Sequence, residues 1–129
     1  MINDETDANF PLKELTEKVI GAAFEVHNHL GAGYLEKVYE NAMLVELGSR
    51  GVEAAAQVMV PVSYKGTLVG DYVADLLIDR SLICEIKATR DVGREHEAQV
   101  INYLKGTGIK VGLLLNFGRT RLRFRRFVF

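Results

Sequence analysis

The chain has 129 residues, 48% of them hydrophobic and 26% charged, with a net charge of −1, a balance typical of one soluble globular domain with a sizeable core. No apolar run approaches the roughly 20 residues that cross a bilayer, and the acidic start MINDETDANF does not resemble a signal peptide, so we expect a cytoplasmic protein without membrane association. The single cysteine, Cys84, excludes an internal disulfide and a four-cysteine metal site within one chain.

The first predicted elements are helical. We expect residues 1–11 to form a flexible N-terminal tail and residues 12–129 to form one continuous domain. Apolar residues recur at three- and four-residue intervals on both sides of GAG at 31–33, which predicts two amphipathic helices joined by a turn. The second of these helices should end near Gly48 or Gly51.

From residue 57 onward the sequence becomes typical of β-structure. Strands are predicted over 57–64, 68–78 and 82–88, separated by a KG turn and by a turn at 79–81. A helix over 93–108, closed by glycine, and strands over 110–117 and 121–129 complete the chain. The order is ααβββαββ, which makes the fold class α/β of the α+β type, with helices packed against a sheet.

The stretch DLLIDRSLICEIKATR, residues 75–90, places charges among residues typical of buried strands. If Arg80 is the apex of a three-residue turn, paired positions sum to 160 and Asp75 lies opposite Glu85. Period two then puts Asp75, Glu85 and Lys87 on one face. The other face collects the apolar residues Ala74, Leu76, Ile78, Leu82, Cys84 and Ile86. A one-residue slip would mix the two sets, so the pattern itself selects this register.

Two facing carboxylates repel each other, and partial burial makes the repulsion stronger. A positive group should therefore lie beside Asp75 and Glu85. Lys87 is one candidate, and a divalent cation is the other, because Mg²⁺ is commonly held by one or two carboxylates with water completing its octahedron. The alternative is a buried Glu–Lys pair with a nearby aspartate and no metal.

Charge is divided unevenly along the chain, since residues 1–89 carry −7 and residues 90–129 carry +6. Near the C-terminus arginines alternate with other residues, which predicts one basic strand face formed by Arg119, Arg121, Arg123 and Arg125. This face is either a phosphate-binding track for nucleic acid or a charged edge strand protected against aggregation. Pairing of such an edge with its symmetry mate would give a homodimer.

The helix predicted over 93–108 carries a polar stripe. His96, Gln99 and Tyr103 fall at i, i+3 and i+7, which places them on one helical face. This face is a candidate contact surface for a nucleic-acid substrate. For His96 the alternative is an ordinary structural histidine.

The ordered series of motifs resembles the PD-(D/E)xK nuclease superfamily. Asp75 followed across a hairpin by EIK at 85–87 carries the resemblance, and GYLEKVY at 33–39 is similar to the signature of its GxxExxY family. The resemblance runs from about Leu12 to the end. It implies a restriction-endonuclease-like core with a mixed sheet, and Mg²⁺- or Mn²⁺-dependent cleavage of nucleic acid, with DNA favoured. Ala74 stands where the superfamily has proline, a position that supplies no ligand.

The resemblance also implies roles for the charged residues of the hairpin. Asp75 and Glu85 would bind the metal, with the carbonyl of Ile86 as a further oxygen ligand. Lys87 would orient or activate the attacking water. The alternative, from another class of protein, is a module that keeps the nuclease fold and binds nucleic acid or a protein without cleavage.

The helices supply the remaining residues that the resemblance implicates. Glu36, the motif glutamate, would lie beside the metal, unless it only braces the turn after Gly33. Glu40, one turn further, would be a helper or a solvated side chain. Gln99 and Tyr103 match a Gln-x-x-x-Tyr pair that contacts the active site or the DNA backbone in related exonucleases, so Gln99 joins the expected catalytic set.

Overall fold

The computed structural model describes residues 11–129, so the expected tail at 1–11 lies outside the described residues except for Pro11. In chain order the described elements are α1 (Lys13–Leu30), α2 (Glu36–Ser49), β1 (Ala54–Tyr64), β2 (Thr67–Ile78), β3 (Leu82–Lys87), α3 (Arg94–Thr107), β4 (Val111–Asn116) and β5 (Arg123–Val128). The predicted order ααβββαββ is confirmed. The largest differences at the boundaries are an earlier start of β1 and a later start of β5.

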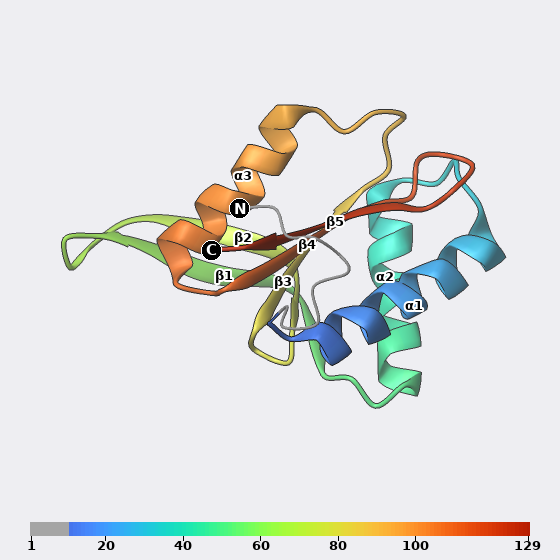
Figure 1. The fold of residues 1–129 in the computed structure, drawn as a ribbon, viewed down its shortest axis with the longest axis horizontal. Coiled ribbons are helices and arrows are strands. Elements are labelled where there is room, and N and C mark those ends of the chain that lie inside the picture. The colour runs from blue at the N-terminus through green and yellow to red at the C-terminus, as the bar shows by residue number, and fades with distance from the viewer. Residues whose placement is uncertain (1–10) are drawn as a thin grey trace.

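The described residues form a five-stranded sheet in the order β1-β2-β3-β4-β5. β3 and β4 run parallel and the other neighbours run antiparallel, so the sheet is mixed. A parallel pair needs a crossover connection, and α3 supplies it. The helices α1 and α2 pack on one side of the sheet and α3 packs on the other (Figure 1). Among residues 11–129, no helix has the length and apolar character to cross a membrane.

Apolar side chains of the described residues gather in two clusters, one on each face of the sheet. Successive residues of β3 alternate between them, as the period of a strand requires. Cys84 and Ile86 pack in the cluster under α1 and α2, whereas Ile83 packs with Leu104 under α3. Each buried side chain of this kind contributes roughly 1.5–3 kcal/mol relative to an exposed one. The central strand β3 is therefore held firmly on both faces.

Near the middle of the β1-β2 hairpin, side chains of the same parity switch from one face of the sheet to the other. Ala56 packs against the α1-α2 cluster, whereas Val60, which has the same parity, packs under α3. Between them lies Gln57, whose φ of +53° is in the left-handed region that residues other than glycine rarely adopt. The strand therefore turns over at Gln57.

The partner strand turns over at the same level. The ladder pairs Ala56 with Leu76 and Val58 with Ala74, and it passes over Gln57 and Asp75 between them. Leu76 stays with the α1-α2 cluster, whereas Ala74 packs under α3. The prediction that Ala74 shares a face with Leu76 is therefore wrong, because simple alternation does not survive the break in the ladder.

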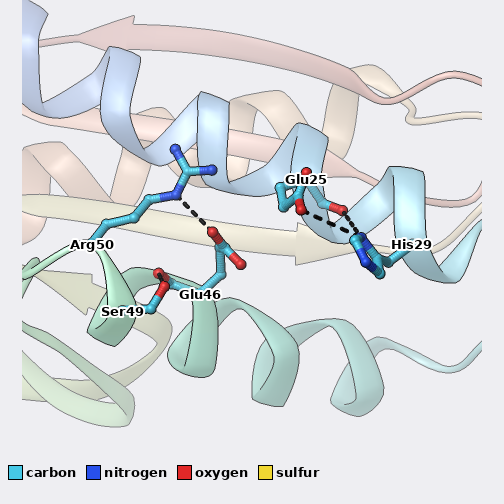
Figure 2. Close-up of polar contacts among 5 residues, drawn as sticks. All are labelled: Glu25, His29, Glu46, Ser49 and Arg50. Atoms are coloured by element: carbon cyan, nitrogen blue, oxygen red, sulfur yellow. Dashed lines mark hydrogen bonds and ion pairs between the residues drawn. The ribbon is translucent and has the colours of Figure 1, made fainter.

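Polar contacts between residues three or four apart in sequence lie along the groove between α1 and α2 (Figure 2). Arg50 Nε lies 2.8 Å from Glu46 Oε2, and His29 Nδ1 lies 3.5 Å from Glu25 Oε2. The Ser49 hydroxyl donates to the Glu46 carbonyl at 2.8 Å. Surface pairs of this kind contribute roughly 0.2–1 kcal/mol. The stability of the fold therefore rests on the two apolar clusters.

Candidate active site

The candidate site lies where β2 and β3 separate. Their ladder runs from Ile78↔Leu82 to Leu76↔Cys84, which confirms the register expected from the turn at 79–81. Beyond it, the side chains link the two strands. The Asp75 N–H donates to Glu85 Oε2 at 3.0 Å, and the Ile86 N–H donates to Asp75 Oδ2 at 2.8 Å. Each carboxylate thus accepts a hydrogen bond from the backbone of the opposite strand.

Both carboxylates are poorly solvated. Burial raises the pKa of Glu85 to about 7, against the opposing effect of the Asp75 N–H, and the charge of Asp75 raises it further. Burial also raises the pKa of Asp75, which the Ile86 N–H partly offsets. The ammonium of half-buried Lys87 lowers the pKa of both groups. The pair therefore concentrates negative charge in a place where a cation would stabilise it.

A third carboxylate reaches the site from α2. Glu40 is only 3% exposed, and its Oε1 accepts a 2.6 Å hydrogen bond from Nε2 of Gln57. Its Oε2 lies 2.6 Å from Nζ of Lys37. The charge of Glu40 raises the pKa of Asp75, and the Gln57 amide lowers it. Gln57 thus stands between the helix carboxylate and the carboxylate of the strand.

The geometry reverses the expected order of the two α2 glutamates. Glu36 is the first residue of α2 and its side chain is exposed, whereas Glu40, one turn later, is buried near Asp75. Both belong to the same i, i+4 row of the helix. The sequence motif selects Glu36 as the site glutamate. The sequence feature that selects Glu40 is its position beside the apolar residues of α2 that face the core.

Tyr39, the tyrosine of the GYLEKVY stretch, is a structural brace. It is fully buried, and its ring stacks on Phe117 with 4.6 Å between centroids. Its hydroxyl donates to the Gly31 carbonyl at 2.6 Å and accepts the Tyr34 N–H at 3.2 Å. These contacts fix the turn between α1 and α2, and thereby the place where α2 begins.

On the other side of Glu85 a cavity of about 540 Å³ opens between β2 and α3, lined in part by Gln99, Tyr103 and Tyr72. The two tyrosine rings stack with 3.3 Å between centroids. The Tyr72 hydroxyl is buried beside the Glu85 carboxylate, and burial together with that carboxylate raises its pKa. Burial also raises the pKa of Tyr103, as do the charges of Glu85 and Asp75. Nothing in the sequence distinguishes Tyr72 from an ordinary aromatic residue of a strand.

The remaining expected contact residues do not form one surface. His96 Nδ1 accepts the Gly93 N–H at 3.3 Å, so His96 caps the start of α3. β5 begins at Arg123, and both Arg119 and Arg121 lie in the preceding bend. Arg119 and Arg123 line one cavity, whereas Arg121 contributes to another that Arg123 also borders. The prediction of one strand face formed by Arg119, Arg121, Arg123 and Arg125 is therefore wrong, since of these four only Arg123 and Arg125 lie in β5.

The donor chemistry of the pair fits a hard divalent cation. One oxygen of Asp75 and one of Glu85 accept a backbone N–H group, and the second oxygen of each accepts none from the backbone. No group of three or more His, Cys, Asp or Glu side chains is arranged to hold a metal in the part of the chain described here. Two carboxylates suffice for Mg²⁺ or Mn²⁺, which take their other ligands from water and substrate.

The comparisons with known proteins agree with this arrangement. The chain is similar to a solved structure described as "Crystal structure of SSO0001", with 18% sequence identity and a TM-score of 0.55. The matched region covers 91% of this chain and 59% of the other. At this identity the likeness concerns the fold alone. No curated protein is significantly similar in sequence to the chain. The family model of the PD-(D/E)XK nuclease superfamily matches residues 13–127, and the chain therefore belongs to that superfamily.

Proposed function

We propose that the chain is a divalent-metal-dependent nuclease that hydrolyses phosphodiester bonds of nucleic acid, with DNA as the favoured substrate, and that it belongs to the GxxExxY family. Membership of the nuclease superfamily supports the general activity. The observation that carries the proposal is the pair Asp75 and Glu85, held by reciprocal hydrogen bonds between strands and flanked by Lys87.

Asp75 and Glu85 would hold the metal, with the carbonyl of Ile86 as a further oxygen ligand. When bound, the ion would lower the pKa of a water molecule and neutralise charge on the phosphate. Lys87 would orient the attacking water and stabilise negative charge that develops on the phosphate oxygens. Its position two residues after Glu85 on β3 places the ammonium close enough to act on both carboxylates.

Glu40 and Gln57 would act as positioning residues for Asp75. The hydrogen bond from Gln57 to Glu40 anchors the amide, and the same amide stabilises the charged form of Asp75. Glu36, expected beside the metal, is exposed at the start of α2, and the burial of Glu40 favours Glu40 as the helix carboxylate of the site.

Gln99 and Tyr103 would contact the nucleic acid next to the scissile bond. Both line the cavity that reaches Glu85, and the stacking of Tyr103 on Tyr72 fixes one wall of it. His96 would contribute through its second ring nitrogen, since the first caps α3. The arginines near the start of β5 would bind phosphates further along the strand.

The test is cleavage of end-labelled DNA and RNA by the purified protein in Mg²⁺, Mn²⁺ or EDTA. We expect cleavage with either metal and none in EDTA. Asp75→Asn should abolish it, whereas Asp79→Asn, the same change at an exposed position in the next turn, should not. If the wild-type protein binds nucleic acid but cuts neither DNA nor RNA with either metal, the binding-module alternative replaces the enzyme.

A further inference from the structure

A second cavity, of about 250 Å³, lies between the start of α3 and the strands β4 and β5. Its lining is strongly basic, with Arg90, Arg119, Arg123 and Arg125 beside the acidic Glu97. Leu114, Asn116 and Phe124 contribute to its walls. The arginines come from the loop after β3, from the loop before β5 and from β5 itself. Segments far apart in sequence therefore converge on one small space.

The positive charge of this cavity is only partly compensated. Arg119 Nη1 lies 3.4 Å from Asp91 Oδ1, and Arg125 Nη1 lies 3.2 Å from Glu97 Oε2. Arg90 and Arg123 form no ion pair with any of residues 11–129, so the lining keeps a net positive charge. Convergent guanidinium groups in a concave site are suited to an anion, and above all to phosphate oxygens.

The buried side chain of Asn116 supplies a neutral donor at the same place. It is 2% exposed, and its Oδ1 accepts the N–H groups of Thr89 at 3.1 Å and of Gly118 at 3.0 Å. Two backbone donors on one oxygen settle which end of the amide is the oxygen. The Nδ2 group then has no acceptor among the described residues, and remains available to a ligand in the cavity that Asn116 lines.

A close backbone contact holds this amide in place. A Cβ atom on Gly118 would lie 2.3 Å from the backbone of Thr89, so only glycine allows the two loops to approach this closely. The loop after β3 and the loop after β4 are thereby locked together around Asn116. The donor is therefore preorganised before any ligand arrives.

The cavity is next to the candidate active site. In the parallel ladder Leu114 pairs with Glu85, and Asn116 pairs with Lys87. Paired residues on neighbouring strands lie about 5 Å apart and project from the same face. A phosphate bound in this cavity would thus lie one β-strand further along the sheet than Glu85, on the same face of the sheet.

We infer that this cavity binds the terminal phosphate of a nucleic-acid strand and so selects phosphorylated ends as substrates. A terminal phosphate carries about −1.5 to −2 charges near pH 7, against −1 for an internal phosphodiester, and it presents three oxygens to the arginines and to Asn116. The inference rests on the proposed nuclease function, because a preference for phosphorylated ends selects substrates only if the protein cleaves nucleic acid. The binding itself can be measured without cleavage.

The experiment compares the affinities of one oligonucleotide with a 5′-phosphate, a 3′-phosphate or no terminal phosphate, in EDTA so that the strand stays intact. We expect one phosphorylated form to bind about tenfold or more tightly than the unphosphorylated form. Inorganic phosphate should compete away that advantage. The double variant Arg90→Ala/Arg123→Ala should lose the preference, and Asn116→Asp should weaken it because the donor becomes an anion. Arg80→Ala, whose side chain is 88% exposed at the β2-β3 turn, is the matched control and should keep the preference.

Equal affinities for the three oligonucleotides would overturn the inference, as would a preference that survives in the folded Arg90→Ala/Arg123→Ala variant. Both arginines are exposed, so this variant should retain the wild-type melting temperature even if Asn116→Asp does not fold. A retained preference for phosphorylated ends in a protein that cleaves nothing contradicts the nuclease proposal alone. Cleavage without any end preference contradicts the phosphate site alone.

Discussion

Nε2 of Gln57 donates a 2.6 Å hydrogen bond to Oε1 of the buried Glu40, and it does so from a backbone with a φ of +53° in the middle of β1. A left-handed residue other than glycine costs of order 1–2 kcal/mol. The strand tolerates this strain at the level of Asp75, where the ladder is interrupted. Strain retained beside a candidate active site is consistent with the proposed role of this amide in positioning Asp75.

Replacing Gln57 separates the backbone strain from the amide contact. Gln57→Ala and Gln57→Gly both remove the hydrogen bond to Glu40, but only glycine relieves the positive φ. We expect Gln57→Gly to be more stable than Gln57→Ala by about 1 kcal/mol in urea unfolding, and both to lose cleavage rate to a similar extent. If the more stable Gln57→Gly variant also cleaves faster than Gln57→Ala, in proportion to its stability, then Gln57 contributes only to folding.

The two glutamates of α2 should differ sharply in their effect on cleavage. Glu40→Gln removes a buried charge that acts on Asp75, so the single-turnover rate should fall tenfold or more and its pH profile should shift. Glu36→Gln changes an exposed side chain and should leave the rate within about twofold. Equal losses in both variants, or a loss confined to Glu36→Gln, would return the role to the motif glutamate.

Sequence patterns predicted the parts of this protein that depend on local rules. The turn at 79–81 fixes the register of β2 and β3, and hydrogen bonds beyond the end of that ladder link Asp75 with Glu85 and Ile86. The face of Ala74 was not predictable, because it depends on the positive φ of Gln57 on the neighbouring strand. The choice of Glu40 over Glu36 likewise depends on how α2 packs, which a motif does not encode.

The basic C-terminal stretch shows the same limit. Alternation from Arg119 to Arg125 predicted one strand face, but the chain bends before Arg123, and Arg121 faces a different cavity from Arg119. Asn116 accepts the Thr89 N–H and Gly118 lies against the Thr89 backbone, so the bend depends on tertiary contacts with the loop after β3. Period-two patterns cannot reveal such contacts.

Without metal, the stability of the protein should fall as the pH rises. Burial raises the pKa of Glu85 from 4.5 to about 7 in the folded state, so its favourable contribution is complete below pH 4.5 and is lost as the pH passes 7. The loss would be at most about 3 kcal/mol. In EDTA, Glu85→Gln should be more stable than wild type at pH 8 and similar at pH 4.5. Urea unfolding at both pH values measures this, with Glu53→Gln, an exposed change, as control. A wild-type protein no less stable than Glu85→Gln at pH 8 would contradict the effect.

Divalent metal should reverse that loss of stability. Mg²⁺ or Mn²⁺ that binds the folded state at a hundred times its Kd would add about 2.7 kcal/mol, which appears as a rise in melting temperature. Asp75→Asn combined with Glu85→Gln should abolish the rise, whereas Asp79→Asn should keep it. Identical shifts in the wild type and the double variant would place the ion elsewhere.

Lys87 tests the central claim most directly, because it separates cleavage from binding. Loss of one group that stabilises transition-state charge typically lowers a rate by about 10²–10³, whereas loss of one cation among many phosphate contacts changes affinity little. The measurement is single-turnover cleavage in Mn²⁺ beside DNA binding in Ca²⁺, for wild type and Lys87→Ala. The nuclease account predicts that wild type cuts, that Lys87→Ala cuts at least a hundredfold more slowly, and that both bind DNA with similar Kd. Equal rates for the two proteins, or a wild-type protein that binds DNA and cuts neither DNA nor RNA, would contradict it.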